Sequence, residues 1–293
     1  MVRLATRRSR LALVQAESAR AALRSAWPAE TFELLEVTTT GDRLRTVSLE
    51  KVDGKGFFTD ALEDSLVRGQ AQLAVHSLKD LPAELDAKFI VAAVLPREDP
   101  RDALVSPHGG LEVLPTGARV GTDSSRRRAQ LLLRRPDLRV ASIRGNVPTR
   151  LAKLDRGDYD ALVLAAAGLV RLGLSDRATQ LLEPEVCLPA PGQGAIAIEA
   201  LAGSEWAEKA RRVDHADSAA AVRAERAFLA ALGGGCETPA GCLARVEDGR
   251  LLLEAVVVSE GAATRTSSAG PAERAEEIGR EAGTRLLSSG AAR

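Results

Sequence analysis

Hydrophobic and polar positions follow two alternating patterns over the first two-thirds of the chain, because short apolar runs are separated by longer amphipathic stretches. This alternation is typical of an α/β sheet. Residues 2–6 have the composition of a strand, and Ser9 could N-cap the helix that follows. The apolar face of that helix is predicted to include Leu11, Val14 and Ala22.

A second strand and helix are predicted downstream. Residues 32–37 form the strand, Asp60 lies in the first turn of the helix, and Gly69 ends it. The apolar positions of this helix are Phe57, Phe58, Ala61, Leu62 and Leu66.

Polar residues gather immediately after the next predicted strand, at residues 73–75. They are His76, Ser77, Lys79 and Asp80. In open α/β sheets, ligands bind outside the carboxyl ends of the strands. This strand end is therefore a candidate site.

Two proline-containing segments, residues 96–100 and 188–194, are predicted to be crossings between two lobes. A chain that crosses twice has the topology of a two-hinge binding protein. The predicted boundaries are 1–96 with 193–213 for lobe 1, 97–192 for lobe 2, and 214–293 for a small α+β domain.

Lobe 2 is predicted to repeat a motif of lobe 1. In this motif, a strand is followed by serine and arginine at the start of a helix. Strand 119–121 leads into the N-cap cluster 122–125 and then into a helix with arginines at 126–128. The longest apolar run, residues 161–170, is predicted to be a buried strand running into a turn. It is about half as long as the ~20 residues that a membrane-spanning helix needs.

The last third of the chain has its own pattern. A helix at residues 217–232 is predicted to end at the glycine run 233–235, with Cys236 directly beyond. The Asp-Gly pair at 248–249 separates two apolar runs, as a hairpin turn would. The tail from 271 to 287 is predicted to be helical.

Composition narrows the possible functions. The chain has 40 basic and 40 acidic residues, and aromatic residues make up 3%, so nucleic-acid or membrane-surface binding has little support. Three cysteines are too few, and odd in number, for a disulfide framework, which predicts a reducing, cytoplasmic location. His76, His108 and His215 have no metal-ligand spacing, so no metal site is predicted.

Positive charge concentrates between residues 119 and 156, which hold eleven basic and three acidic residues. Arg134, Arg135, Arg139 and Arg156 are predicted to form a solvated face. Four other arginines lie where strands end and helices begin. The free N–H groups of a helix start and the bidentate guanidinium groups of arginine both favour the binding of carboxylates. These candidate ligands are Arg126, Arg127, Arg144 and Arg150.

The three cysteines are predicted to differ in role. Cys187 and Cys242 lie in apolar surroundings and are interpreted as core residues. Cys236 follows three glycines and precedes Glu-Thr-Pro. A glycine run that holds one cysteine on an exposed loop presents a nucleophile well.

Taken in order, these segments resemble the porphobilinogen deaminase family over nearly the whole chain. The resembling stretches are Arg3-Leu-Ala-Thr-Arg7 with Ser9 and Gln15, Thr39-Thr-Gly-Asp42, Lys51 with Gly54-Lys-Gly-Phe57-Phe58, Ala74-Val-His-Ser-Leu-Lys-Asp80, Arg97-Glu-Asp-Pro-Arg-Asp102, Arg144-Gly-Asn146, Leu172-Gly-Leu174, Leu188-Pro-Ala-Pro-Gly-Gln-Gly194 and Gly234-Gly-Cys236.

The resemblance implies an α/β fold with two doubly wound, periplasmic-binding-protein-like lobes and a small α+β C-terminal domain. It implies a monomeric transferase of heme and tetrapyrrole biosynthesis that condenses four porphobilinogen molecules head to tail, releases ammonia and yields hydroxymethylbilane. A dipyrromethane cofactor would be thioether-linked to Cys236. Asp80 would be catalytic, stabilising positive charge on a pyrrole, and the segment from 41 to 56 would be a lid.

The resemblance also assigns residues that bind substrate and cofactor, mostly through carboxylates. They are Arg7, Ser9, Gln15, Lys51, Lys55, Phe58, Ser77, Lys79, Thr122, Ser124, Arg126, Arg127, Arg144, Asn146, Arg150, Arg171 and Gln193.

One motif departs from the family, which commonly has Ser-Ser-Leu-Arg-Arg where this chain has Asp123-Ser-Ser-Arg-Arg-Arg128. Asp123 then replaces a serine, and Arg128 becomes an alternative to Arg126 in the arginine register. Two other functional classes stay open: a two-lobed carboxylate-binding protein without chemistry, which leaves Cys236 unexplained, and nucleic-acid binding through residues 126–128.

Overall fold

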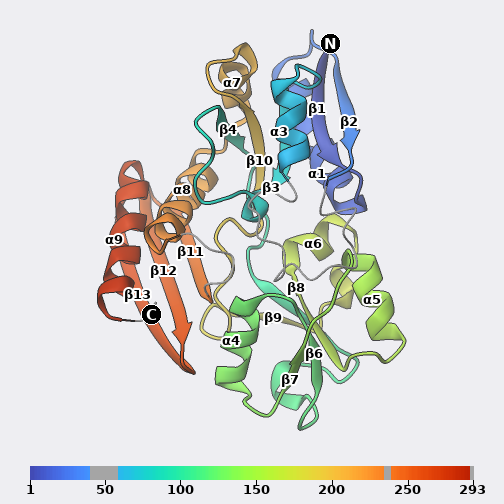
Figure 1. Ribbon diagram of the computed structural model, residues 1–293, viewed down its shortest axis with the longest axis vertical. Helices are drawn as coiled ribbons and strands as arrows, with labels where there is room; N and C mark the ends of the chain where they lie inside the picture. The colour runs from blue at the N-terminus through green and yellow to red at the C-terminus, as the bar shows by residue number, and fades with distance from the viewer. Residues whose placement is uncertain (40–58, 234–238, 291–293) are drawn as a thin grey trace. The chain divides into compact units, whose positions relative to one another are not determined.

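The computed structural model describes residues 1–39, 59–233 and 239–290 (Figure 1). The chain divides into two compact units, of which the first comprises Met1–Arg97 with Ala195–Ala219 and the second Glu98–Gly194 with Ala220–Arg293. The chain passes between the units at residues 97–98, within the first predicted crossing, at 194–195, at the end of the second, and a third time at 219–220. Within the described ranges, no helix is long and apolar enough to cross a membrane.

The first unit contains a five-stranded sheet in the order β2-β1-β3-β10-β4. Strands β1, β2 and β3 are parallel, and β10 runs antiparallel to both of its neighbours. The bounds are β1 Val2–Arg7, β2 Phe32–Val37, β3 Leu73–Ser77, β4 Phe89–Val94 and β10 Ile196–Leu201.

Helices cover both faces of this sheet. Helices α1 (Arg10–Ala26) and α7 (Glu205–Ala210) bury apolar side chains against one face, and α3 (Asp60–Val67) packs on the other. Asp60 in the first turn of α3 and Gly69 beyond its end, with φ of +66°, confirm those predictions.

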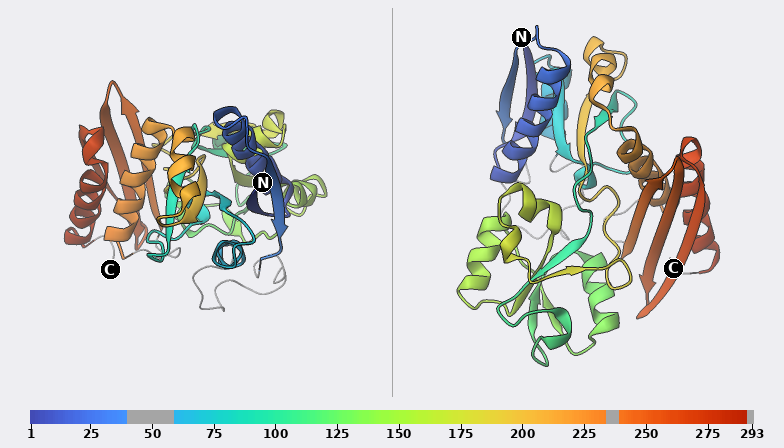
Figure 2. Two further views of the ribbon diagram at one scale, coloured as in Figure 1. Left: turned by 90° about the horizontal axis from the view of Figure 1, so that it is seen from above. Right: turned by 180° about the vertical axis from the view of Figure 1, so that it is seen from behind.

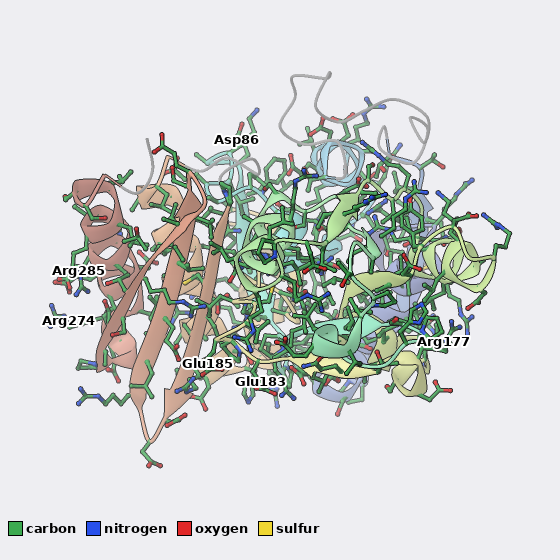
Figure 3. All side chains as sticks on the ribbon, turned by 90° about the horizontal axis from the view of Figure 1, so that it is seen from below. Asp86, Arg177, Glu183, Glu185, Arg274 and Arg285 are labelled. Carbon is green, nitrogen blue, oxygen red and sulfur yellow. The ribbon has the colours of Figure 1, made fainter. Side chains whose placement is uncertain are left out.

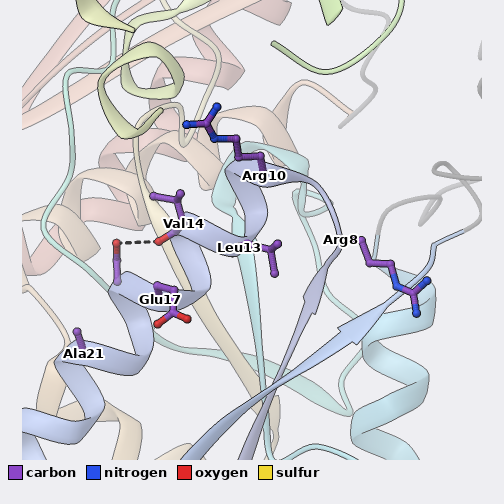
Figure 4. Close-up of a pocket in the computed structure, with 7 residues that line it drawn as sticks. Arg8, Arg10, Leu13, Val14, Glu17 and Ala21 are labelled. Atoms are coloured by element: carbon purple, nitrogen blue, oxygen red, sulfur yellow. Dashed lines mark hydrogen bonds between the residues drawn. The ribbon is translucent and has the colours of Figure 1, made fainter. Parts of the chain in front are cut away.

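The predicted apolar face of α1 was wrong in part. Gln15, Ala16, Ala19 and Leu23 are the buried residues of the helix, and Ala22 packs at their edge. Leu11 and Val14 are only half-buried; Val14 lines a surface hollow beside Arg10 and Glu17 (Figure 4). Small alanines let α1 lie close to the sheet, which favours a different stripe from the one that the larger residues indicated.

The second unit contains a sheet with the same order of strand types, β7-β6-β8-β5-β9. Strands β6, β7 and β8 are parallel, and β5, the first strand after the first crossing, runs antiparallel to β8 and β9. In the first sheet, β10 follows the second crossing and occupies the same fourth place. The bounds are β5 Asp102–Val105, β6 Arg119–Gly121, β7 Arg139–Ala141, β8 Ala161–Ala165 and β9 Gln180–Leu182.

Three helices belong to this sheet: α4 (Ser125–Arg134), α5 (Val147–Asp155) and α6 (Ala166–Arg171). The predicted strand at 161–165 is confirmed as β8, but the expected turn after it is wrong because α6 begins directly at Ala166. The segment that enters α6 is rich in alanine and leucine, which favour helix.

A three-stranded antiparallel sheet lies at the C-terminal end, with β11 (Ala240–Glu247), β12 (Arg250–Ser259) and β13 (Ala262–Pro271) in that order (Figure 2). Asp248 and Gly249 have φ of 50° and 74°, which confirms the hairpin turn. The tail prediction missed β13 and placed the helix start too early, because α9 begins only at Ala275.

Helices α8 (Ala216–Ala231) and α9 (Ala275–Ser288) supply apolar side chains to one face of this sheet. The two helices approach closely, since a Cβ on Gly279 would lie 2.0 Å from the carbonyl oxygen of Ala224. On the other face, Val256 and Val258 pack with Leu188 of the second crossing. Within the described ranges, short 3₁₀ segments lie at Leu78–Asp80, Leu111–Val113, Ser175–Arg177, Arg211–Val213 and Ala272–Arg274.

Candidate functional site

In the first unit, predicted site residues come together at the carboxyl ends of β1 and β3. Arg7 is the last residue of β1. Ser9 accepts a hydrogen bond from the amide of Ala12 at 3.2 Å, which confirms the prediction that it N-caps α1. A small hollow of about 80 Å³ forms here. It is lined by Arg7, Ser9, Leu11, Ala12, Gln15, Val75, His76, Ser77 and Asp80.

Gln15 and Ser77 join α1 to β3 at the wall of this hollow. The amide nitrogen of Gln15 lies 2.8 Å from Oγ of Ser77, although Gln15 itself is buried. Lys79 and Asp80 follow on the 3₁₀ turn Leu78–Asp80 and are exposed. The hollow therefore combines an accessible carboxylate with cationic and hydroxyl side chains.

A buried acid on β10, the neighbouring strand, contacts β3 through His76. Nε2 of His76 is 2.9 Å from Oε2 of Glu199 on β10, and neither side chain is more than 3% exposed. The other oxygen of Glu199, Oε1, is buried and has no hydrogen-bond partner among the described residues. On α3, burial and then the charge of Glu199 raise the pKa of Glu63.

In the second unit, Arg126 and Arg127 point inward from the start of α4 to Asp102 on β5. Arg126 donates from Nη1 to Asp102 Oδ2 at 2.7 Å and to the carbonyl of Leu188 at 2.5 Å. Arg127 donates from Nε and Nη2 to Asp102 Oδ1 at 3.0 and 2.7 Å, and from Nη1 to the carbonyl of Val163. Nε of Arg126 is buried, and no group in the described part of the chain accepts a hydrogen bond from it.

These two arginines hold Asp102 ionised. Burial alone would raise the pKa of this carboxyl, but the charges of Arg126 and Arg127, with their hydrogen bonds, keep the pKa well below its ordinary value. Arg128 differs, since it is exposed and donates to the carbonyl of Val140 at 3.0 Å. The helix thus separates 126 and 127, which turn inward, from 128 at the surface.

A second group of cationic side chains lies beside the loops that precede α4 and α5. Ser124 N-caps α4, accepting from the amide of Arg127, and Thr122 Oγ1 accepts from the amide of Ser124 at 3.2 Å. Asn146 N-caps α5 and accepts from the amide of Thr149 at 3.0 Å. Both caps fix helix starts beside arginines.

Arg144 and Arg150 are half-buried beside these caps. Nε of Arg144 lies 3.6 Å from Oδ2 of Asp123. Nε of Arg150 donates to the carbonyl of Gly145 at 2.7 Å. Burial, then the positive charge of Arg127, lowers the pKa of Arg150, as expected where guanidinium groups cluster.

The second crossing holds two more predicted residues. Gln193 is fully buried and donates from Nε2 to the carbonyl of Pro100 at 2.7 Å and to Asp102 Oδ1 at 2.9 Å. Arg171 donates to the carbonyl of Gly194 at 2.6 Å, and burial lowers its pKa. Gln193 and Arg171 therefore each donate a hydrogen bond to a backbone carbonyl within a predicted crossing.

Four predicted residues lie outside the described ranges: Lys51, Lys55, Phe58 and Cys236. The lid prediction for 41–56 lies there too. The core role of Cys187 and Cys242 is confirmed, since both side chains are fully buried within hydrophobic clusters. Burial raises the pKa of the Cys187 thiol to about 12. Among the described residues, no group of three or more His, Cys, Asp or Glu side chains could hold a metal ion.

Surface arginines of the second unit have a different environment. Figure 3 labels Arg177, Arg274 and Arg285 near the edge of the drawing. Arg177 pairs with Asp155 at 2.5 Å, and Arg134 in the predicted solvated face pairs with Glu112 at 2.7 Å. Exposed ion pairs of this kind contribute little to the free energy of folding. The buried arginines, Arg126 and Arg127, therefore differ from them in their environment.

Two important carboxylates had no predicted role. Asp102 is only the last residue of the resembling stretch 97–102, and Glu199 lies in none of the predicted site segments. The available signal was a single acid inside an otherwise apolar strand, Asp-Ala-Leu-Val for one and Ile-Ala-Ile-Glu-Ala-Leu for the other. Such an acid is almost never buried without a partner.

Comparisons with known proteins agree along the chain. Residues 2–209 match the family profile described as "Porphobilinogen deaminase, dipyromethane cofactor binding domain", and residues 219–288 match "Porphobilinogen deaminase, C-terminal domain". A porphobilinogen deaminase of Desulforudis audaxviator is 51% identical over 290 residues, covering 98% of this chain and 94% of that protein. One from Bordetella parapertussis is 49% identical over 292 residues, covering 98% and 93%.

Solved structures show weaker similarity. The second substrate binding domain of a putative amino acid ABC transporter from Streptococcus pneumoniae has a TM-score of 0.44 at 15% identity, covering 80% of this chain and 95% of that one. The α/β fold class rests instead on the two matching strand orders and on the two crossings between them.

Proposed function

We propose, because the chain belongs to the porphobilinogen deaminase family, that Asp80 is its catalytic carboxylate and Cys236 the attachment point of its cofactor. The chain is a transferase with a dipyrromethane cofactor, and its reaction condenses four porphobilinogen molecules into hydroxymethylbilane with release of ammonia. The residue roles are the part that needs an experiment.

The donor set fits a cofactor that carries several carboxylates. Arg7 and Ser9 lie at one strand end with Ser77, and Arg144 and Arg150 lie at helix starts in the second unit. When bound, the dipyrromethane supplies the electron-rich pyrrole to which substrate units are added, and guanidinium groups are suited to hold its acid side chains.

The observation that carries the proposal is the placement of Asp80 in the strand-end hollow. Its carboxylate is exposed, whereas its neighbours Gln15 and Ser77 are fixed by their mutual hydrogen bond. A carboxylate on a rigid strand end can accept a pyrrole N–H and stabilise positive charge that develops on the ring. Lys79 and Gln193 would support binding.

The first test is the intact mass of the purified protein with peptide mapping of the segment around Cys236. We expect an adduct of two pyrrole units on Cys236, and no adduct on Cys236→Ala. Asp80→Asn should carry the same adduct but turn over at least about 100-fold more slowly, the usual contribution of an electrostatic or acid–base group.

Other outcomes would change the conclusion. A folded protein that porphobilinogen cannot load would be better described as a carboxylate-binding protein without chemistry. Normal turnover by Asp80→Asn would remove the catalytic role of that residue.

Location and assembly belong to the same proposal. We infer a monomer in the cytoplasm, which the family assignment and the small, odd number of cysteines in the sequence support. Native mass measurement across a range of protein concentrations tests the monomer, because a dimer would increase with concentration.

A further inference from the structure

Asp123 holds together the loop that carries Arg144. Its Oδ1 accepts hydrogen bonds from Oγ of Ser142 at 2.5 Å and from the amide of Ile143 at 3.2 Å. Its Oδ2 faces Nε of Arg144 at 3.6 Å. The carboxylate therefore occupies one side of a guanidinium group that is proposed to bind an acid side chain of the ligand.

The surroundings of Asp123 are otherwise cationic. Arg144 and Arg150 repel one another, and Arg127 acts on Arg150 from α4, whereas Asp123 is the acid that favours the charged form of Arg150. Both partners of the Asp123–Arg144 contact are about one-third exposed, at 28% and 34%. A carboxylate of a ligand can therefore reach the same guanidinium group.

We propose that Asp123 is a specificity-determining residue that competes with ligand carboxylates for Arg144 and so weakens their binding. This inference rests on the proposed function, because it needs Arg144 to bind substrate or cofactor. Asp123 holds Arg144 in place while the site is empty, and an incoming carboxylate must replace it. The same charge keeps the arginine cluster from attracting unrelated anions.

Asp123→Asn separates the charge of this residue from its structural role. The amide oxygen can still accept from Ser142 and from the amide of Ile143, so the loop is retained while the negative charge is lost. We expect the KM for porphobilinogen to fall about three- to tenfold, the size expected from removing one unit charge beside a partly exposed guanidinium group. KM should also rise more steeply with salt, because less of the positive charge is neutralised internally.

A second readout does not depend on turnover. Glutarate is a simple dicarboxylate, and its apparent Kd follows from the rise of Tm with glutarate concentration. Asp123→Asn holoenzyme should bind glutarate more tightly than the wild type by a similar factor. Asp158→Asn is the matched control, since Asp158 forms an exposed pair with Arg156 at 2.8 Å in the same unit; it should leave both values unchanged.

An Arg144→Gln background tests whether Asp123 affects ligand binding by competing for Arg144. There, Asp123→Asn should no longer change KM or glutarate binding, because the shared partner is missing. A persistent effect would overturn competition at Arg144 in favour of a general charge effect. An unchanged KM, or an increased one, in Asp123→Asn would also overturn the inference, and an increase would mean that Asp123 itself contacts substrate.

Different outcomes would contradict the proposed function and the proposed role of Asp123. If the wild type carries no pyrrole adduct and consumes no porphobilinogen, the proposed function fails, while the glutarate titration still decides whether Asp123 opposes anion binding. If the wild type turns over normally and Asp123→Asn matches it in both readouts, only the role of Asp123 fails.

Discussion

The two sheets carry buried carboxylates on corresponding strands, but the carboxylates differ in how they are satisfied. Asp102 lies on β5 and Glu199 on β10, the antiparallel strand in fourth place in each sheet, and both side chains are fully buried. Asp102 accepts from two arginines and from Gln193. Glu199 contacts His76 through one oxygen, and its other oxygen has no hydrogen-bond partner in the ranges that the structure describes.

This difference shows that one position in a repeated fold can serve two purposes. Asp102 has enough fixed donors to remain charged, and it in turn orients the first two arginines of α4. Glu199 shares its environment with a histidine that lines the strand-end hollow. The second unit therefore uses its buried acid to fix arginines, and the first uses its acid to position one end of β3.

The largest effect is expected for Asp102→Asn. Removing the charge leaves two buried guanidinium groups without an anion, which should lower the free energy of unfolding by about 3–5 kcal/mol. Urea denaturation at neutral pH measures this loss. Asp155→Asn, which removes the exposed partner of Arg177, is the control and should change it by less than about 0.5 kcal/mol.

The pH dependence of this variant has a defined sign. The pKa of Asp102 is lowered in the folded state, so its stabilisation is present above the ordinary aspartate pKa and is lost as pH falls towards the folded value. The gap between wild type and Asp102→Asn should therefore shrink below about pH 4. A constant gap from pH 7 to pH 3 would contradict the assignment of a buried, ionised carboxylate.

A smaller loss is expected for Glu199→Gln. Glutamine retains an acceptor for His76 and removes a buried acid that lacks a second partner, so the cost should be about 1–2 kcal/mol or less. Urea denaturation beside Asp102→Asn gives the ranking directly. If Glu199→Gln were as costly as Asp102→Asn, the contrast between the two units would be wrong.

A modest pH-dependent effect is expected for Glu63→Gln. The pKa of Glu63 is raised by burial and by Glu199, so its protonated form favours the fold at low pH and that contribution is lost as pH rises through the raised pKa. The variant should match the wild type near pH 4 and exceed it slightly in Tm near pH 8. A lower Tm at pH 8 would show that the ionised group is stabilising.

The smallest expected effect is chemical and concerns Cys187, whose sulfur lies 3.4 Å from Asp102 Oδ2. Because burial raises its pKa to about 12, iodoacetamide at pH 8 should leave Cys187 unmodified in the folded protein and modify it in urea. Peptide mapping checks this. Rapid labelling under native conditions would mean that the interior around Asp102 opens readily.

Local rules in the sequence predicted much of the fold. Ser9 was predicted as a helix cap, the cluster 122–125 was predicted to hold the cap that the structure identifies as Ser124, and the Asp-Gly pair at 248–249 was predicted as a hairpin turn. Each of these features depends on neighbouring residues only. The stripe of α1 that faces the sheet was missed because it depends on what the sheet presents. Strand β13 was missed because its polar sequence pairs with β12 in a register that only the folded sheet defines.

The candidate site divides in the same way. The strand-end group around Asp80 followed from the sequence because parallel strands place their carboxyl ends together. The inward direction of Arg126 did not, because it depends on Asp102, 24 residues away, and on the carbonyl of Leu188, 62 residues away. Long-range partners of this kind leave no spacing that a single sequence can reveal.

The place of β10 in the first sheet has a consequence for the order of events during synthesis. Strands β3 and β4 pair with β10 on either side, yet β10 starts at Ile196, about a hundred residues after β4 ends. At roughly 5–20 residues per second, a ribosome needs about 5–20 seconds to supply the missing strand. Until then, β4 has no neighbour in its sheet, and the newborn chain exposes both edges of β4 and one edge of β3, which makes this interval the natural point for chaperone binding.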